Sequence, residues 1–349
     1  MATPTSQMQQ YQRTIDDLTS RAWYNILRDD PVNQILEITP FYNMMIEKGK
    51  IKDRMPDGTH WEVPIKYNKQ DQNMLWFGKG STFSMAEKEE NTRLRFEARN
   101  LGTNIIRYWD DERKINGQAK LQDYVEDKTS STMEALQDEI AASLWTNATD
   151  NPLQMTALDE LISPDPTSGV VGGLDRSVNP HLRNQTADMT SLSFASDSLG
   201  VMRKMINDCS NYRGNDKGSD GKNGPSRAGS RPDIIVTTQA IYEAYEDIAE
   251  NLRRIDSNDA IRANLGFGDL AFKGIEMFYD PGCPAGNMYF LNTGTLELKY
   301  DPRFWMTMTD WKPVQGNSLD RNAQVVSVMQ LTCDMFRRNG VIHGIDPTS

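Results

Sequence analysis

The stretch that most limits the possible folds is residues 233–300. It opens with the apolar run DIIVT, which predicts a buried strand. Thr237 and Thr238 follow as good helix-capping residues. The next residues predict an amphipathic helix, because apolar side chains recur at alternating spacings of four and three: Ile241, Tyr245, Ile248, Leu252 and Ile255. Short strand patterns then continue to Tyr300, around the phrase LAFKGIEMF. This order predicts an α/β domain.

Upstream, residues 60–108 predict a long β-hairpin. Its first arm has the alternation of a strand, with apolar side chains at every second position: Trp61, Val63, Ile65 and Tyr67. Pro64 lacks a backbone donor, so this strand is expected at a sheet edge. The returning strand is expected at residues 94–108, where apolar residues alternate again.

The segment that joins the two hairpin arms is rich in large aromatic residues. A two-stranded ribbon is marginally stable alone, and aromatic side chains exposed on it indicate either an aggregation hazard or an interface. We interpret the hairpin tip as an interface. The residues expected to contact a neighbouring subunit there are Trp76, Phe77, Lys79 and Phe83.

Residues 121–146 predict one long helix, of about 39 Å at 1.5 Å per residue. One stripe of this helix is expected to pack on the body: Leu121, Val125, Thr132, Leu136, Ile140 and Leu144. The same segment holds six carboxylates and a single lysine, Lys128. Its outer face is therefore expected to be negative and solvated.

Residues 1–50 predict an arm. A helical apolar stripe is present, but it is too thin to fold alone, and a helix there should end before Pro31. We expect the arm to pack on a neighbouring subunit through Trp23 and Tyr24. The body itself is expected to have two packed α/β parts, with the arm and the hairpin outside both.

Composition narrows the function. The net charge is −11, and the pI is near 4.9. An acidic chain disfavours nonspecific binding to nucleic acid, because phosphate neutralisation requires a surface of lysine and arginine. The mean hydropathy of −0.64 is low for a compact chain of this length and suits a protein that buries surface against neighbours. No run of about 18 apolar residues is present, so no membrane partner is expected.

Signals for catalysis or cofactor binding are weak. The three cysteines are far apart, without a CxxC pair, and are expected to be buried as small apolar residues. The loop GNDKGSDGKNG places Asn223 where a phosphate loop requires Ser or Thr, and its Gly218 and Arg227 replace calcium ligands. No G-x-S-x-G nucleophile motif occurs. We therefore expect no catalytic site, no metal and no cofactor, and we predict a protein that is not an enzyme.

The order of these features resembles the major capsid protein of tailed bacteriophages, the Hong Kong 97-type fold. Three phrases look like the apical-domain sequence of phage coat proteins: GGLDRSVNPHLRNQ, PDIIVTTQAIYEAYEDI and GFGDLAFKGIEMFYDPGCPAGNMYFLNTGTLEL. The resemblance implies an α+β fold with five segments. These are an N-terminal arm (1–50), an extended loop (51–108), a peripheral domain (109–154 and 301–349) with its spine helix (121–146), and an apical domain (155–300).

The resemblance also implies a function. Such proteins form an icosahedral shell of hexamers and pentamers around double-stranded DNA, assembled in the bacterial cytoplasm and found in the virion. The implied partners are further copies of the chain, a portal, a decoration protein and packaged DNA that is enclosed without specific binding. About twenty residues precede Trp23, which favours a separate scaffolding protein over a fused one. Some relatives crosslink a lysine of the extended loop, and Lys79 lies near that tip, but no partner for it is identified.

Two alternatives stay open at this point. One is the shell of a bacterial nanocompartment, which has the same fold and encloses cargo enzymes. The other is an uncharacterised hydrolase, which would need to show turnover as a monomer.

Overall fold

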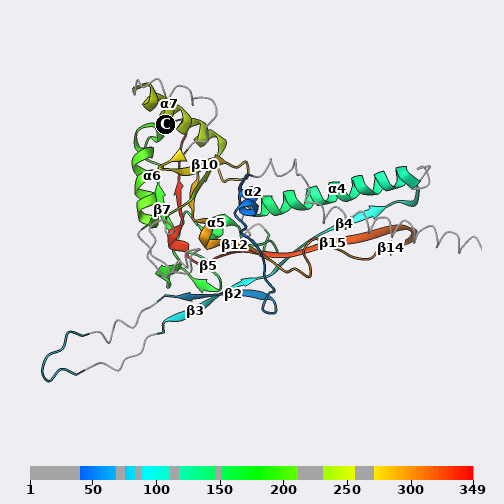
Figure 1. Ribbon diagram of the computed structural model, residues 1–349, viewed down its shortest axis with the longest axis horizontal. Helices are drawn as coiled ribbons and strands as arrows, with labels where there is room; N and C mark the ends of the chain where they lie inside the picture. The colour runs from blue at the N-terminus through cyan, green and yellow to red at the C-terminus, as the bar shows by residue number, and fades with distance from the viewer. Residues whose placement is uncertain are drawn as a thin grey trace, which may run out of the picture.

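The protein is an elongated molecule with a block of helix and sheet at one end, a long sheet and helix at the other, and a projecting hairpin (Figure 1). The computed structural model describes residues 40–67, 75–82, 89–110, 118–146, 151–210, 231–255 and 271–348. The larger elements form two six-stranded sheets, which confirms the predicted mixture of α and β structure.

The first sheet is built on one long strand, β15 (Asn317–Cys333). One edge of β15 pairs with β4 (Arg99–Arg107), and its other pairing partners are the strands β12 (Leu296–Tyr300), β13 (Thr307–Met308) and β14 (Lys312–Val314). The short strand β1 (Ile51–Asp53) extends the sheet by pairing in parallel with β12. Residues 99–107 therefore pair with residues 321–329 in one antiparallel ribbon, although the two segments are far apart in the chain.

Helix α4 (Gln118–Ser143) runs along this ribbon (Figure 1) and confirms the predicted long helix, shifted by three residues at each end. Its buried residues Leu136 and Ile140 belong to the same apolar core as Val325 of β15, while Thr132 is half-buried. Lys128 donates a hydrogen bond from Nζ to the backbone oxygen of Ile106, at 3.0 Å. This contact ties the helix to β4.

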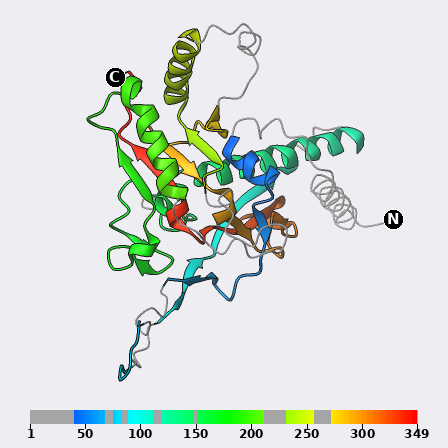
Figure 2. The same cartoon turned by 60° about the vertical axis from the view of Figure 1, so that its left-hand side comes forward.

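The second sheet has the order β7-β16-β11-β8-β10-β9. Its strands are β7 (Gln185–Asp188), β8 (Ile234–Thr237), β9 (Ala271–Phe272), β10 (Ile275–Tyr279), β11 (Met288–Leu291) and β16 (Gly340–His343). Two helices pack on it, α6 (Phe194–Ser210) and α7 (Gln239–Ile255) (Figure 2). The strand and helix predicted from residue 233 onward are thus β8 and α7. As expected, β8 is completely buried.

Short elements complete the described chain: helices α2 (Pro40–Glu47) and α5 (Leu158–Leu161), the strand pair β5 (Val170–Val171) and β6 (Leu174–Asp175), and the 3-10 turns η2 (Pro180–Leu182), η3 (Thr293–Thr295) and η4 (Phe336–Arg338).

At α2, the Phe41 N–H donates a hydrogen bond to the Asp280 carboxylate at 3.1 Å. Burial raises the pKa of Asp280, and donated hydrogen bonds from Gly282 and Phe41 oppose that rise. A buried carboxylate thus joins α2 to the end of β10.

The hairpin is shorter than the sequence predicts. Strand β2 (His60–Lys66) pairs with β3 (Asn91–Glu97). This strand ends before Ala98, and the next strand, β4, belongs to the first sheet. The expected single returning strand, 94–108, is therefore wrong. It divides because β15 offers residues 99–107 a nine-residue pairing edge that β2 does not provide.

Pro64 lies at a position of β2 where no backbone N–H is needed for pairing with β3. Tyr67 donates its N–H to Glu90, and Ala98 donates to Thr59, so the odd-numbered residues of β2 are the ones that bond to β3. Because donors alternate along a strand, the nitrogen of Pro64 points away from β3. The proline costs no ladder hydrogen bond and leaves the outer edge of β2 without one donor.

The two sheets do not follow the sequence order expected for the domains. Strand β12 ends at Tyr300 but lies in the first sheet, whereas β16 comes after β15 and completes the second sheet. The chain therefore crosses to the first sheet at η3, a few residues before the expected boundary at residue 300, and crosses back once more to the second sheet through η4. The five domain limits stay predictions.

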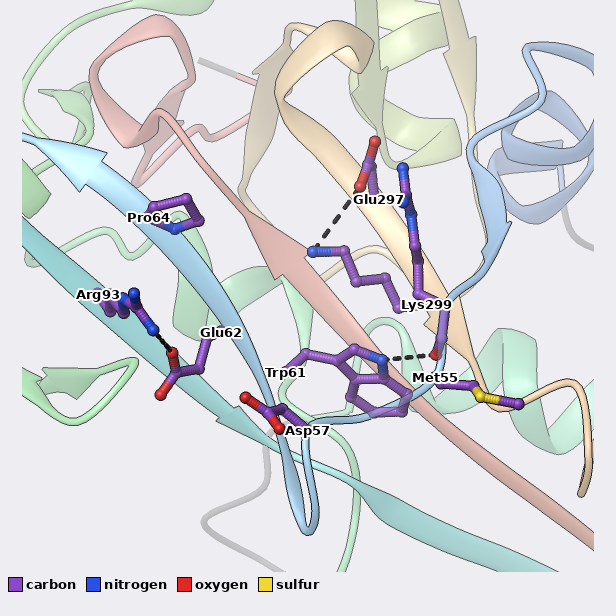
Figure 3. A pocket seen from close by; sticks show the side chains of 9 residues that line it. Met55, Asp57, Trp61, Glu62, Pro64, Arg93, Glu297 and Lys299 are labelled. Carbon is purple, nitrogen blue, oxygen red and sulfur yellow. Dashed lines mark hydrogen bonds and ion pairs between the residues drawn. The ribbon is translucent and has the colours of Figure 1, made fainter.

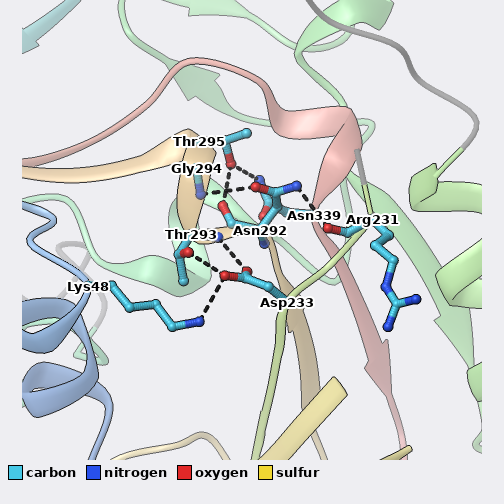
Figure 4. Close-up of polar contacts among 8 residues, drawn as sticks. All are labelled: Lys48, Arg231, Asp233, Asn292, Thr293, Gly294, Thr295 and Asn339. Carbon is cyan, nitrogen blue, oxygen red and sulfur yellow. Dashed lines mark hydrogen bonds and ion pairs between the residues drawn. The ribbon is translucent and has the colours of Figure 1, made fainter. Parts of the chain in front are cut away.

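Asn339, which is fully buried, joins both of these crossings (Figure 4). Its Oδ1 accepts the N–H of Asn292 at 2.7 Å, and its Nδ2 donates to Thr295 Oγ1 at 2.9 Å. Nearby, Asp233 accepts hydrogen bonds from the N–H and hydroxyl of Thr293 and pairs with Lys48 at 2.9 Å. One amide thus fixes η3 and η4 against each other.

We expect Asn339→Leu to lower the free energy of unfolding by about 1–3 kcal/mol, because the Asn292 N–H and the Thr295 hydroxyl would each lose a buried partner. The matched control is Asn91→Ala, at an exposed position of β3, which should change stability by less than about 0.5 kcal/mol. Urea unfolding of both variants measures the difference. Equal stability would show that Asn339 does not hold the crossings.

Candidate assembly interface

Ion pairs across the two strands hold the base of the hairpin together. Glu62 of β2 accepts a hydrogen bond from Arg93 at 2.5 Å and lies 3.3 Å from Arg95. The hydrogen bond from Arg93, helped by that from His60, lowers the pKa of Glu62 below its usual range. Beneath these polar side chains the opposite face of the ribbon is apolar, with Trp61 and Phe96 directly paired and buried.

A second set of contacts holds the hairpin against the body. The Arg95 N–H donates to Gly172 O at 2.9 Å, in the turn between β5 and β6. Gly172 has a φ of +58°, and a Cβ there would lie 2.8 Å from that of Leu94, so only glycine fits. Tyr67 stacks on His181 with ring centroids 4.8 Å apart. Burial, with Arg337 nearby, lowers the pKa of His181, which favours its neutral form.

The hairpin tip is exposed where it is described. Trp76 is 102% exposed and Phe77 is 70% exposed, and Lys79 is exposed as well. Phe83, Trp23 and Tyr24 lie outside the described residues, so their predicted contacts stay predictions. Aromatic side chains this exposed are costly in water and are typical of a surface that becomes covered on association.

A groove lies between the hairpin base and the first sheet (Figure 3). Its volume is about 450 Å³, and Trp61, Glu62 and Arg93 of the hairpin face Glu297 and Lys299 of β12 across it. Burial lowers the pKa of Lys299, which lies 3.8 Å from Glu297. The lining carries charges of both signs. It therefore does not select an anionic or cationic small ligand by net charge.

The outer side of α4 carries acidic groups. Glu134, Asp138 and Glu139 are all exposed, as expected for the polar face of this helix. The other three carboxylates of the segment fall where side chains are outside the described part. The negative outer face is confirmed for the C-terminal half of α4.

The described residues contain no candidate metal site. No group of three or more His, Cys, Asp or Glu side chains that could hold a metal ion occurs among them. Cys209, Cys283 and Cys333 are free and buried, as expected, and burial raises the pKa of each thiol. None of the described helices is long and apolar enough to cross a membrane.

Sequence reasoning missed the contacts that orient the hairpin. No sequence pattern gave Gly172 a structural role, although its carbonyl oxygen accepts the backbone N–H of Arg95 in β3. The stacking of His181 on Tyr67 had no local signal in the sequence, because the two residues are far apart along the chain. The pair of adjacent glycines at 172 and 173, both with positive φ, was the one available clue to a tight turn.

Comparison with known proteins identifies the fold. No known family profile matches the sequence, and no curated protein matches it. Among solved structures, the chain is similar to one in the capsid asymmetric unit of cyanophage A-1(L), with 15% identity and a TM-score of 0.61, covering 88% of this chain and 93% of that one. A chain from the capsid of a native GTA particle matches with 11% identity and a TM-score of 0.53, covering 86% and 89%. One from the capsid of Myoviridae phage XM1 matches with 10% identity and a TM-score of 0.52, covering 86% and 92%.

These similarities extend over nearly the whole of each chain, so they concern the complete architecture and not one shared motif. The protein has the fold of the major capsid proteins of tailed phages, as the sequence resemblance predicted. At these identities the likeness establishes the fold, and the function is argued separately below.

Proposed function

We propose that this protein is a major capsid protein that self-assembles into the icosahedral head of a tailed double-stranded DNA phage. In this proposal it is a structural protein of the virion and not an enzyme. The observation that carries the proposal is the combination of a capsid-type fold with a hairpin that ends in exposed aromatic residues. In a monomer Trp76 buries no apolar surface, because its side chain is fully exposed to water. In a shell, contact with a neighbouring subunit would cover it on every copy.

The proposed partners follow from a closed shell. Copies of the chain form hexamers and pentamers, with Trp23 and Tyr24 of the arm (1–50) and the hairpin tip as contacts between subunits. A portal, a separate scaffolding protein and a decoration protein act during assembly in the host cytoplasm and maturation of the procapsid. The spine helix and the first sheet serve as the peripheral domain, and the second sheet serves as the apical domain.

Electron microscopy tests the proposal directly. We expect the purified chain, alone or produced together with its scaffolding protein, to form closed particles of uniform diameter. Particles that contain DNA when produced in an infected host would support a phage head over a nanocompartment with enzyme cargo. A chain that stays monomeric under all of these conditions contradicts the shell function.

The hairpin tip should matter for assembly and not for folding. We expect Trp76→Ala with Phe77→Ala to leave the melting temperature of the free subunit unchanged, because Trp76 is fully exposed. Particle yield should fall by about tenfold or more, since truncating an aromatic anchor commonly costs about 2 kcal/mol and the contact repeats on every copy.

The matched control for the tip variant is Trp61→Ala, because Trp61 is buried under the hairpin base. It should destabilise the subunit itself, by about 3–5 kcal/mol. Normal particle yield from the Trp76 and Phe77 variant would remove the tip from the proposed contacts.

The acidic side of α4 is proposed to line the interior, where it faces packaged DNA. Like charges repel at short range, and physiological salt screens this repulsion beyond about 8–10 Å, so the DNA is enclosed without adhering. We expect purified subunits to give no retardation of duplex DNA at about 0.15 M salt. Tight binding that weakens steeply with salt would show that a basic surface faces the genome instead.

A further inference from the structure

Helix α2 is attached to both sheets. Its residues Phe41 and Met45 are buried in a core that also includes Val236 of β8 and Leu298 of β12. After residues 48–50 the chain enters β1, which pairs in parallel with β12 of the first sheet. Figure 1 shows α2 where the end of α4 meets the second sheet. The helix therefore spans the boundary between the two sheets.

A buried carboxylate of the second sheet holds the first turn of α2. Asp280 directly follows β10, is 2% exposed, and accepts the N–H of Phe41 at 3.1 Å and that of Gly282 at 2.8 Å. The Trp145 side chain donates a third hydrogen bond to it. Because Pro40 begins the helix and has no N–H, the Phe41 N–H is the first backbone donor of α2. A negative charge at this end also complements the helix dipole.

A second carboxylate holds the other end of α2. Lys48, the residue after the helix, pairs with Asp233 at 2.9 Å (Figure 4). Asp233 also accepts the N–H of Thr293 at 2.7 Å, in the turn η3 through which the chain crosses to the first sheet. Asp233 precedes β8 and Asp280 follows β10, and these two strands are parallel neighbours. The two attachments of α2 therefore lie at opposite ends of one strand pair, about 12 Å apart along the helix.

The end of the long helix α4 meets the same corner. Trp145 follows α4, and its ring lies 5.2 Å from that of Phe41 and 5.5 Å from that of Tyr289 in β11. A Cβ at Gly282 would lie 2.5 Å from Cδ1 of Trp145, so the turn after Asp280 packs directly on the indole ring. Asp280 thus joins α2, the end of α4 and the second sheet.

The positions of the two attachments have a mechanical consequence. The chain crosses between the sheets at η3 and η4, which Asn339 joins, and a connection at one place permits rotation about that place. The attachment of Lys48 to Asp233 lies at this crossing, so it opposes rotation weakly. The attachment at Asp280 lies at the far end of α2, where the same rotation would displace the helix most.

We propose that Asp280 is a positioning residue that fixes the angle between the two sheets, and that this angle sets the curvature with which copies of the chain assemble. The inference rests on the proposed shell function and deepens it. A closed assembly requires one rotation to repeat at equivalent contacts. Subunits whose sheets rotate offer a range of angles, so loss of this attachment should produce shells of mixed diameter.

The first test is Asp280→Asn, which keeps the size of the side chain but replaces one acceptor oxygen by an amide donor. The matched control is Asp188→Asn. Asp188 also ends a strand, β7, and accepts the N–H of Thr190 at 2.9 Å, but it is exposed. Electron microscopy should show uniform particles for the wild type and the control, and a diameter distribution at least about twice as wide for Asp280→Asn.

A third variant tests the lever argument itself. Lys48→Met removes the partly exposed ion pair at the crossing, and such pairs contribute little to stability. Particles of this variant should keep the uniform diameter of the wild type. A broad distribution from Lys48→Met and a uniform one from Asp280→Asn would reverse the assignment of the two attachments and overturn the inference.

Hydrogen exchange in free subunits measures the attachment without assembly. Asp280→Asn should raise the exchange rate of the Phe41 amide by about tenfold or more, because its buried, charged acceptor is replaced. The amides of β8 should keep their protection, since their partners lie in β10 and β11. Circular dichroism of the same samples measures whether the subunit stays folded.

The outcomes separate this inference from the shell function. Uniform particles from Asp280→Asn, together with faster exchange at Phe41, overturn the link to curvature and leave the shell function standing. Unchanged exchange at Phe41 shows that Asp280 does not hold α2, and a subunit that unfolds as a whole shows a general role in stability; either result overturns the inference. A wild-type chain that forms no particles removes the shell function and the assignment of curvature with it.

Discussion

The structure depends on the double pairing of β15. This strand of 17 residues bonds to β4 along one edge and to β12, β13 and β14 along the other. It thereby joins segments that lie more than 200 residues apart in the chain. The pairing supplies the platform on which α4 packs, and it also divides the expected hairpin, because residues 99–107 gain more backbone hydrogen bonds from β15 than β2 can provide.

The same pairing determines what the surface can do. Helix α4 covers one side of the ribbon, and nothing in the described chain covers the other side. Separate contacts hold the hairpin base against the body: the hydrogen bond to Gly172 and the stack of Tyr67 on His181. The exposed aromatic tip projects from one end of the molecule, and the ribbon extends from the hairpin base toward the other end (Figure 1). An exposed aromatic tip on a projecting hairpin favours association between copies of the chain.

The junction at Asn339 makes the two sheets one body. Because the chain crosses between them through both η3 and η4, a single buried amide that bonds to each turn restricts their relative movement. Buried hydrogen-bond networks of this kind contribute specificity because each group left unpaired is costly. The proposed shell function would require such rigidity, since a small change in angle at each subunit would accumulate around a ring.

The sequence by itself determined the local elements. Periodicity and capping residues predicted β8, α7 and the long helix α4, because the side chains that produce these patterns are neighbours along one face. Composition also predicted the buried cysteines and the acidic side of α4. Only the tertiary structure decided the pairing of β4 with β15, the position of β16 in the second sheet and the contact of Gly172 with β3. Each of these depends on which distant strand supplies the partner, and sequence periodicity carries no information about that choice.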